Sequence, residues 1–504
     1  MNYLELFSLL EPEIAITGLI FLILAIDLFG LKNKTVLFRF QLLGLLTGIG
    51  LAVIMLRTAM IQLPPAAARN LLGGMLVLDP LTVLFKILLI TFALITVIIC
   101  MNEEFTTHVS EFYALLLFAL LGMIFMVMSE ELIMIFVALE LTSLSLYILT
   151  AFAKRHLYSA EAAMKYFLFG TLSSAFMYFG LGYIYGIAGV TNLKGLGDYL
   201  SALPKLMIST DHILVIVGLL FTMMGMGFKI AVVPFHLWAP DAYEGAPTPV
   251  TGFIATGSKA ASFLILAKIL LSGFLKMEGS SLQHAWEAGW SPLLATLSIA
   301  SMTLGNLAAM QQKNIKRLLA YSSIAHSGYI LFGLIAASHV GTVAMFFYII
   351  VYAFTNLGAF GFVSVVARHT GGENLEDFRG FADRAPLLSL LMSIYILSLA
   401  SIPPLGGFFG KFYLFLAVVG RDTDRYGLLW LVAIGIINTM LSLYYYLKIL
   451  KQMYIVKSPN PTRIQSPFYL NAALSLCALI VLLTGIFPAP LIGILSRSVP
   501  FFSV

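Results

Sequence analysis

The stretch "GFKIAVVPFHLWAPDAYEGAPTPVTGFIATGSKAA", residues 227–261, is mostly apolar, yet it contains two lysines, Lys229 and Lys259. Both lysines stand inside runs whose composition suits the interior of a lipid bilayer. Four prolines, two acidic residues and a histidine separate them. The stretch therefore predicts membrane-spanning helices that are interrupted by proline and that carry ammonium groups inside them.

The rest of the chain has the same apolar character. Of its 504 residues, 60% are hydrophobic and 11% are charged, and the mean hydropathy is +0.97. Soluble domains have about 25% charged residues, and a transmembrane β-barrel needs alternating strands of about 10 residues. The long unbroken apolar runs exclude both classes, so we expect an all-α polytopic membrane protein.

Hydropathy predicts about fourteen transmembrane helices of roughly 20 residues each. They begin near Pro12, Gln41, Pro80, Tyr113, Leu132, Ser159, Ile213, Thr248, Pro292, Ile315, Gly341, Leu387, Leu428 and Leu470. The loops between them are short, so no separate soluble domain is expected.

Loop charge predicts the orientation, because cytoplasmic loops carry an excess of lysine and arginine. Loops after odd-numbered spans hold 15 basic residues: Lys32, Lys34, Arg39, Lys154, Arg155, Lys313, Lys316, Arg317, Arg368, Arg379, Arg384, Lys448, Lys451, Lys457 and Arg463. Loops after even-numbered spans hold seven: Arg57, Arg69, Lys194, Lys205, Lys276, Arg421 and Arg425. We therefore expect the odd loops in the cytoplasm and both termini on the outer side of a bacterial inner membrane or an equivalent energy-transducing membrane.

The spacing of two lysines indicates an internal repeat. Lys229 and Lys411 are 411 − 229 = 182 residues apart, close to the 292 − 113 = 179 residues between the fourth and ninth predicted spans. A block of five spans is odd-numbered, so the second block would enter the membrane inverted, as in many transporters. Breakers occur in both fourth helices, at Pro234 and in "SIPPLGGFFGKF" (residues 401–412), although the lysine precedes the proline only in the first. The predicted division is 1–108, 109–280 (first repeat), 281–456 (second repeat) and 457–504.

Six ionisable side chains fall deep inside predicted spans: Glu140, Lys165, Lys229, Lys259, Lys268 and Lys411. Each costs about 2.5–3.5 kcal/mol at the bilayer centre on insertion scales, whereas an ordinary domain is stable by only about 5–15 kcal/mol. They must therefore be paired, hydrated or neutral. Two explanations remain open: structural ion pairs, or a set that carries protons. Lys268 fits either explanation, and Lys86 in the third span fits a structural role better.

A proton path explains the set because desolvation pushes a buried lysine toward neutrality and a nearby carboxylate pushes it toward charge. Glu140 is the only carboxylate near the centre of a span, so its expected partner is Lys229 or Lys165. Lysine suits proton transfer better than arginine, which keeps its proton. His236 follows Lys229 by seven residues, about two helical turns, and is expected on the same face as a relay or a gate. His326 in the tenth span fits packing and relay equally.

The stretches "PFHLWAPDAYEGAPTPVTGFIATGSKAA" (234–261), "KNIKRLLAYSSIAHSGY" (313–329) and "SIPPLGGFFGKFYLF" (401–415) resemble the antiporter-like membrane subunits of respiratory complex I. The resemblance spans roughly residues 110–455 and is greatest to the subunit N group. Subunits L and M and the cation/proton antiporter subunits differ in sequence in the first stretch, and subunit M has glutamate at the position of Lys411. Asp241 and Glu244 lie in a proline-rich turn of that stretch, where they would cap a helix or guide protons.

The resemblance implies a role for each matching residue. Glu140 is similar to the fifth-span glutamate that pairs with the seventh-span lysine, here Lys229, and Lys165 to a sixth-span lysine beside that pair. Lys259 is similar to the central eighth-span lysine, and Lys411 to the twelfth-span lysine of a second half-channel. The implied fold has fourteen spans with two inverted five-helix repeats that contain broken helices.

The implied function is proton translocation by a membrane subunit of an NADH-quinone oxidoreductase, a translocase whose redox chemistry lies in other subunits. No cofactor is expected in this chain, because Cys100 and Cys477 are lone thiols that cannot hold a cluster or a structural zinc, and the complex would use NADH or ferredoxin, quinone, flavin and iron–sulfur clusters elsewhere. Expected partners are the other membrane and peripheral subunits, neighbouring antiporter-like subunits, the lipid bilayer, protons and internal water. Nucleic acid is not expected, since the net charge of +5 is spread over loops. The alternatives are a subunit of a multisubunit cation/proton antiporter and a scaffold without conduction.

Overall fold

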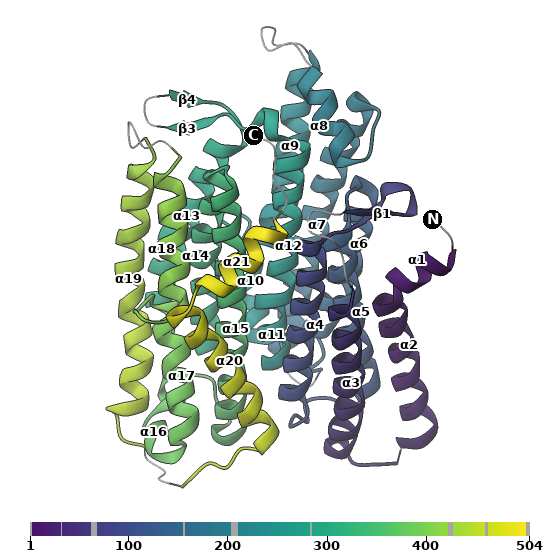
Figure 1. The fold of residues 1–504 in the computed structure, drawn as a ribbon. Helices are drawn as coiled ribbons and strands as arrows, with labels where there is room; N and C mark the ends of the chain where they lie inside the picture. The colour runs from purple at the N-terminus through teal and green to yellow at the C-terminus, as the bar shows by residue number, and fades with distance from the viewer. Residues whose placement is uncertain are drawn as a thin grey trace.

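The computed structural model describes residues 3–31, 33–61, 68–154, 157–202, 210–282, 285–421, 427–458 and 462–499. Four of the loop cations counted above, Lys32, Arg155, Lys205 and Arg425, lie outside these residues. The described chain is a bundle of helices, with the N-terminal helices on one side, α17 to α19 on the other, and the C-terminal helices α20 and α21 across the face between them (Figure 1).

The helices of the first half are α1 (Tyr3–Leu9), α2 (Glu11–Ile26), α3 (Val36–Ala59), α4 (Pro80–Cys100), α5 (Val109–Met128), α6 (Leu132–Thr150), α7 (Leu157–Ala188), α8 (Leu193–Ala202), α9 (Thr210–Lys229) and α10 (Trp238–Gly245). Those of the second half are α11 (Thr248–Phe253), α12 (Lys259–Lys268), α13 (Trp290–Met310), α14 (Ile315–Ile335), α15 (His339–Thr370), α16 (Phe381–Arg384), α17 (Pro386–Leu399), α18 (Gly406–Val419), α19 (Leu429–Tyr454), α20 (Phe468–Ile486) and α21 (Ala489–Ser498). Two short antiparallel hairpins pair β1 (Arg69–Leu71) with β2 (Leu76–Leu78) and β3 (Ser280–Leu282) with β4 (Ala285–Glu287).

Twelve of the described helices are long and apolar enough to cross a membrane. Three shorter apolar helices, α9, α17 and α18, add two crossings when α17 and α18 are counted as the halves of one interrupted span. The chain is therefore a multi-pass membrane protein, and the expected number of about fourteen spans is confirmed. Each predicted span begins within five residues of an observed helix, and the largest difference is between Gln41 and Val36.

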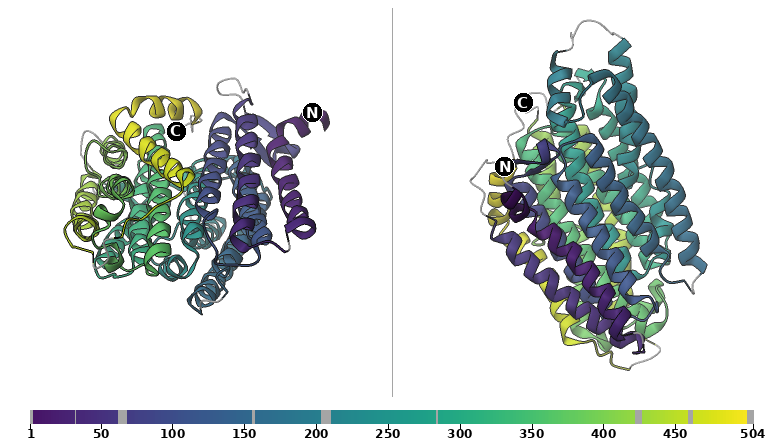
Figure 2. Two further views of the ribbon diagram at one scale, coloured as in Figure 1. Left: turned by 90° about the horizontal axis from the view of Figure 1, so that it is seen from below. Right: turned by 90° about the vertical axis from the view of Figure 1, so that its right-hand side faces the viewer.

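The middle of the bundle is formed by helices that contact protein rather than lipid. One continuous helical run extends from α11 to the end of a π-helical segment at Ile269–Gly273, and the most apolar part of this run is completely buried. The most apolar part of α15 is also completely buried. Pairs that are close in sequence pack along each other, among them α5 with α6, α7 with α9 and α13 with α14. Figure 2 shows that the N-terminal helices and the helices α17 to α19 flank this centre from opposite sides.

The expected helix breaks are present. The helix α9 ends at Lys229, and the non-helical residues 230–237 precede α10. Residues 400–405, which include two prolines, separate α17 from α18. A proline removes a backbone donor and cannot continue a helix without a kink, and backbone groups freed inside a membrane need partners. Two serines are such partners. Ser301 accepts a hydrogen bond from Val233 N at 2.9 Å, and Ser327 donates one to Ile230 O at 2.7 Å.

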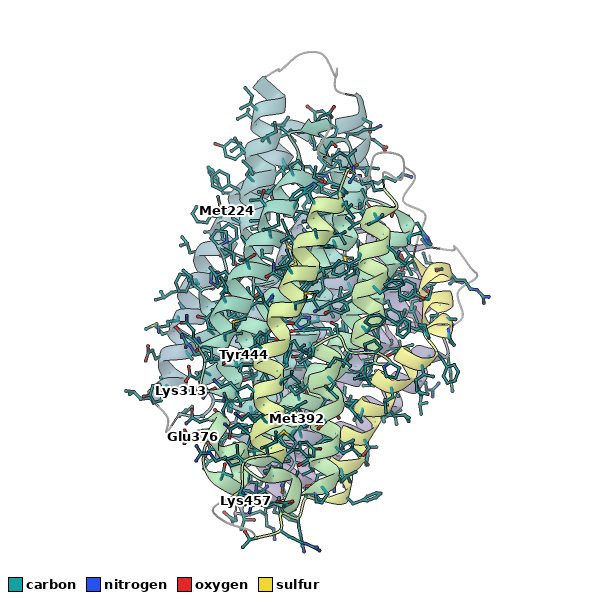
Figure 3. All side chains as sticks on the ribbon, turned by 90° about the vertical axis from the view of Figure 1, so that its left-hand side faces the viewer. Met224, Lys313, Glu376, Met392, Tyr444 and Lys457 are labelled. Atoms are coloured by element: carbon teal, nitrogen blue, oxygen red, sulfur yellow. The ribbon has the colours of Figure 1, made fainter. Side chains whose placement is uncertain are left out.

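One end of the bundle collects the loops that were expected to be basic. Lys313 follows α13 and Lys457 follows α19, and both lie toward the same end as Glu376, whereas Met224 of α9 lies toward the other end (Figure 3). This arrangement agrees with the predicted grouping of odd-numbered loops. The side of the membrane on which this end lies, and the boundaries of the two repeats, stay predictions.

Candidate functional site

Three buried lysines lie on the helices that border the breaks. Lys229 is the last residue of α9, Lys259 is the first residue of α12, and Lys411 lies in the second turn of α18. Their residues are 8%, 3% and 2% exposed. Among the described residues, no carboxylate lies within ion-pair distance of any of the three, although a lone buried charge is costly inside a membrane. Their hydrogen-bond partners therefore determine what they can do.

Lys229 contacts a hydroxyl group rather than a carboxylate. Its ammonium donates to Ser143 Oγ of α6 and lies 5.3 Å from the ring centre of Phe228. Glu140, one helical turn before Ser143, accepts a hydrogen bond from Ser174 of α7 and is near enough to act on Lys229 electrostatically. The two expected partners are thus neighbours with Ser143 beside them, and a direct pair between them stays a prediction.

Lys165 pairs with carboxylates other than Glu140. Its side chain is 40% exposed within this chain, so it is not deep in the helix bundle. Its ammonium pairs with Glu161 at 2.7 Å, one turn earlier on α7, and with Asp241 of α10 at 2.8 Å. Lys165 is therefore not the partner of Glu140. The sequence could not reveal this, because Asp241 reaches Lys165 from a helix 76 residues later.

Asp241 and Glu244 lie on a helix, α10, and not in the expected turn. Arg317 of α14 donates to Asp241 at 2.5 Å and to Glu244 at 2.9 Å. Together with Lys165, these residues form an ion cluster that joins α7, α10 and α14 at the half-exposed edge of the bundle. The proline-rich sequence predicted a turn, but the residues between Leu237 and Ala246 form a short helix.

Lys259 has an acceptor for each of its three ammonium protons. The acceptors are the carbonyl oxygen of Ser323 at 2.9 Å, the hydroxyl of Ser323 at 2.5 Å and the hydroxyl of Ser327 at 2.9 Å. The helix is in π form at Ile254–Ser258, directly before the lysine. Such bulges occur often at functional sites, because they turn a side chain away from its regular position. Here all acceptors come from α14.

A histidine and several tyrosines connect the surroundings of Lys259 with those of Lys411. Tyr352 donates to Ser323 Oγ at 2.8 Å, and its ring lies 5.2 Å from that of His326. One ring nitrogen of His326 contacts the hydroxyl of Tyr348 at 2.5 Å, and the other contacts that of Tyr446 at 3.0 Å. Since a neutral imidazole has one donor and one acceptor nitrogen, His326 can take a proton on one side and release one on the other.

Lys411 has no hydrogen-bond partner among the described residues. Its ammonium lies over the ring of Tyr329, one turn after His326 on α14, and both Lys411 and Lys259 act electrostatically on His326. The structure therefore brings Lys259, His326 and Lys411 into one buried cluster. The role of each of them stays a proposal.

The helical-face argument for His236 is wrong, because α9 ends at Lys229 and the six residues between the two are not helical. His236 is buried, and its Nδ1 atom has no hydrogen-bond partner among the described residues. It lines a cavity of about 320 Å³ together with Lys165, Asp241, Arg317 and Tyr321. His236 thus faces the ion cluster and not the cluster of Lys259.

Two further buried cations form ion pairs across helices. Lys268 pairs with Glu130 at 2.9 Å and donates to Val127 O at 2.9 Å. Lys86 of α4 pairs with Glu13 of α2 at 2.6 Å, and both side chains are almost completely buried. The sequence showed both lysines but not their partners. Glu13 and Glu130 lie near helix ends, where acidic residues are common and give no sign of a buried ion pair.

The comparisons with known proteins agree with the motifs. Residues 129–442 match the family model described as "NADH:quinone oxidoreductase/Mrp antiporter, TM". The chain is 41% identical to "NADH-quinone oxidoreductase subunit N 2" of Acidobacterium capsulatum, over 97% of this chain and 98% of that protein. It is 37% identical to "NADH-quinone oxidoreductase subunit N" of Dehalococcoides mccartyi, over 97% of this chain and 99% of that protein.

Solved structures show the same fold. A chain of respiratory complex I from Thermus thermophilus is 30% identical and superimposes with a TM-score of 0.77, covering 97% of this chain and all of that one. A chain of the Mrp complex from Dietzia sp. superimposes with a TM-score of 0.78 at 17% identity, covering 97% of this chain and 96% of that one, and shows the fold alone.

Proposed function

Because the chain belongs to the family of transmembrane subunits of NADH:quinone oxidoreductases and Mrp antiporters, we propose that it is the subunit N of a proton-pumping NADH-quinone oxidoreductase. Full-length relatives with that printed name support this assignment over the alternative, a cation/proton antiporter subunit. The likeness to the Mrp complex is one of fold only. Electron transfer would take place in other subunits, which hold the flavin, the iron–sulfur clusters and the sites for NADH and quinone.

The observation that carries the proposal is that three buried lysines, Lys229, Lys259 and Lys411, have no carboxylate within ion-pair distance among the described residues, with His326 between the last two. A lysine can bind and release a proton in such a place, whereas an arginine keeps its own. The path proceeds from Lys259 through Ser323 and Tyr352 to His326. Lys411 lies over the ring of Tyr329, one turn after His326 on α14, and its ammonium has no hydrogen bond to the imidazole or its tyrosines among the described residues.

Lys229 and Glu140 form the switch of this path. In the structure Lys229 donates to Ser143, one turn away from Glu140. Because α9 ends at Lys229, the side chain can swing from the hydroxyl to the carboxylate when the neighbouring segment 230–237 moves. An ammonium that leaves Ser143 for Glu140 changes the electrostatic potential at the next lysine and can drive its proton onward.

Partners and location follow from the same assignment. The chain would lie in a bacterial inner membrane or an equivalent energy-transducing membrane, with other membrane subunits on its exposed apolar faces. The end with Lys313 and Lys457 would face the cytoplasm, following the excess of positive charge. Both termini would then be on the outer side. Lys165 and His236 would act at the ion cluster, where they hold or gate α10.

The experiment is proton translocation by the assembled complex in membrane vesicles, measured per quinone reduced. Lys259→Met keeps the volume of the side chain and removes its proton site, so pumping through this chain should cease while the complex remains assembled. Lys457→Met, at an exposed loop position, is the matched control and should pump normally. Normal pumping by Lys259→Met would contradict the proposal, and copurification without any quinone-reducing subunit would favour the antiporter alternative.

A further inference from the structure

A large cavity lies at the end of the bundle that holds the loops after α13 and α15. Its volume is about 770 Å³, and its walls come from the α4–α5 loop, the α10–α11 junction, the start of α14 and the end of α15. Its charged lining residues are Glu103, Glu104, Glu244, Lys316, Arg368 and Glu373, and Thr248 and Ser364 are among those that bring hydroxyl groups. Lys313 and Glu376, each one or two residues from a lining asparagine, mark this end in Figure 3.

Glu103 is a half-buried carboxyl in the lining of this cavity. It lies in the loop between α4 and α5 and accepts a hydrogen bond from Ser364 of α15. Burial raises the pKa of Glu103 to about 7, and Glu373 adds to the rise, although the Ser364 hydrogen bond, Arg368 and Lys316 act in the opposite direction. A carboxyl with such a pKa is protonated and deprotonated in turn near neutral pH.

The inner wall of the cavity is held by Lys316 and Glu373. The ammonium of Lys316 donates to Ala246 O at 2.9 Å and pairs with Glu373 at 2.9 Å, and Thr248 donates to the same carboxylate at 2.9 Å. These contacts fix the start of α11 against α14 and α15. Polar groups of the lining thus meet at the first residue of the helix that leads to Lys259.

From this wall, polar groups continue toward Lys259. Thr248 begins a continuous helical run in which Lys259 follows eleven residues later, about 16 Å away at the ordinary rise. Beside this run, Thr251 donates to the carbonyl of Tyr243 at 3.0 Å. The hydroxyl of Tyr243 lies 3.4 Å from Ser323 Oγ, which is an acceptor of Lys259.

We propose that this cavity is the proton entrance of the chain and that Glu103 is the carboxyl that takes protons up from the aqueous phase. In each cycle the Glu103 carboxylate accepts a proton from a hydronium ion, forming one O–H bond. It then gives the proton to water in the cavity, and that water passes it along α11 to neutral Lys259, which becomes an ammonium. No electron moves, and the carboxylate is regenerated. The inference rests on the proposed function.

The first test compares pH profiles of proton pumping in assembled complexes. Glu103→Gln should lower pumping severalfold, and more at about pH 8 than at about pH 6, because uptake limits the rate where protons are scarce. Glu103→Asp should recover most of the loss. Glu376→Gln removes an exposed carboxylate at the same end but outside the cavity, and it should leave the profile unchanged. Equal profiles for Glu103→Gln and the unaltered complex would overturn the assignment.

A second test uses one sample before and after modification, so that a folding defect cannot imitate the result. A negatively charged thiol reagent is added to complexes with Glu103→Cys or Glu376→Cys; both natural cysteines are buried. Modification should stop pumping only at position 103. Full pumping after complete modification there, together with a pumping defect in Lys259→Met, would place the entrance elsewhere and leave the proposed function intact. Normal pumping by Lys259→Met would refute both.

Discussion

The ammonium nitrogen of Lys411 lies 4.1 Å from the centre of the Tyr329 ring and has no hydrogen-bond partner among the described residues. An aromatic face attracts a desolvated cation by about 2 kcal/mol, less than three hydrogen bonds to oxygen would contribute. Lys259, in contrast, has an oxygen acceptor for each proton. Lys259 and Lys411 therefore differ in their surroundings: oxygen acceptors hold the first ammonium, and an aromatic face lies against the second.

Lys411→Ala should reduce proton translocation by about tenfold or more while the complex still assembles, because the terminal proton site is lost. Lys411→Arg should not restore pumping, since a guanidinium keeps its proton at any working pH. The measurement is protons moved per quinone reduced in vesicles, with Lys457→Ala as the exposed control. Pumping at the normal ratio by the arginine variant would show that a fixed charge suffices at this position.

Glu140→Gln should impair pumping about as severely as Lys229→Ala, because each removes one half of the same switch. The double variant should be little worse than either single one, since residues that act as a unit are not additive. Glu140→Asp should retain part of the activity. Pumping is measured in the three variants side by side, and losses that simply multiply would mean that the two residues act independently.

Ser143 offers a separate test of the same switch. It holds Lys229 in the observed position, one turn away from Glu140. In Ser143→Ala the ammonium loses this hydroxyl and should stay near the carboxylate, so that pumping slows although both charges are present. Ser145→Ala, two residues further along α6 and hydrogen-bonded to the Leu141 carbonyl, is the matched control. Equal rates in the two variants would assign Ser143 no part in the switch.

His326→Gln distinguishes a proton relay from a packing residue. Glutamine can still donate to one tyrosine and accept from the other, so the complex should assemble with unchanged thermal stability. It cannot bind and release a proton, so pumping should fall by roughly 10²-fold. Retention of normal pumping in the assembled variant would identify His326 as a packing residue.

The ion cluster of α10 should matter for stability more than for the rate of pumping. Asp241→Asn leaves Lys165 and Arg317 with fewer acceptors, and the loss should be about 1–2 kcal/mol, because the groups are partly exposed and screened by solvent. The thermal midpoint of the purified complex should fall, whereas Glu376→Gln should leave it unchanged. A loss of pumping at full stability would instead place Asp241 on the proton path.

Orientation can be measured with single cysteines and a membrane-impermeant thiol reagent applied to intact cells. Lys313→Cys and Lys457→Cys lie at the end predicted to be cytoplasmic and should be protected (Figure 3). Lys276→Cys, which shortly precedes β3 at the opposite end in Figure 1, should be labelled. The reverse pattern would invert the topology, together with the direction in which protons enter.

The sequence predicted where helices begin. Polar residues are costly in lipid, so the start of an apolar run in the sequence marks the start of a span. It also placed the breaks, since proline signals them locally. It could not predict the exposure of Lys165, because that exposure depends on how α7 packs against other helices. It could not predict the partner of Lys86 either, because Glu13 lies on α2, far from Lys86 in the sequence. The prediction for His236 was wrong for another reason. Counting residues around a helix assumes that the helix continues, and α9 ends at Lys229.

The buried pair of Glu13 and Lys86 has a consequence for the synthesis of the protein. The two residues are 86 − 13 = 73 positions apart, and a ribosome adds about 5–20 residues per second. Glu13 therefore leaves the ribosome roughly 4–15 s before the lysine that neutralises it. Because an unpaired charge resists entry into lipid, we expect α2 to reach its final depth only when α4 arrives, so that the two helices complete their insertion together.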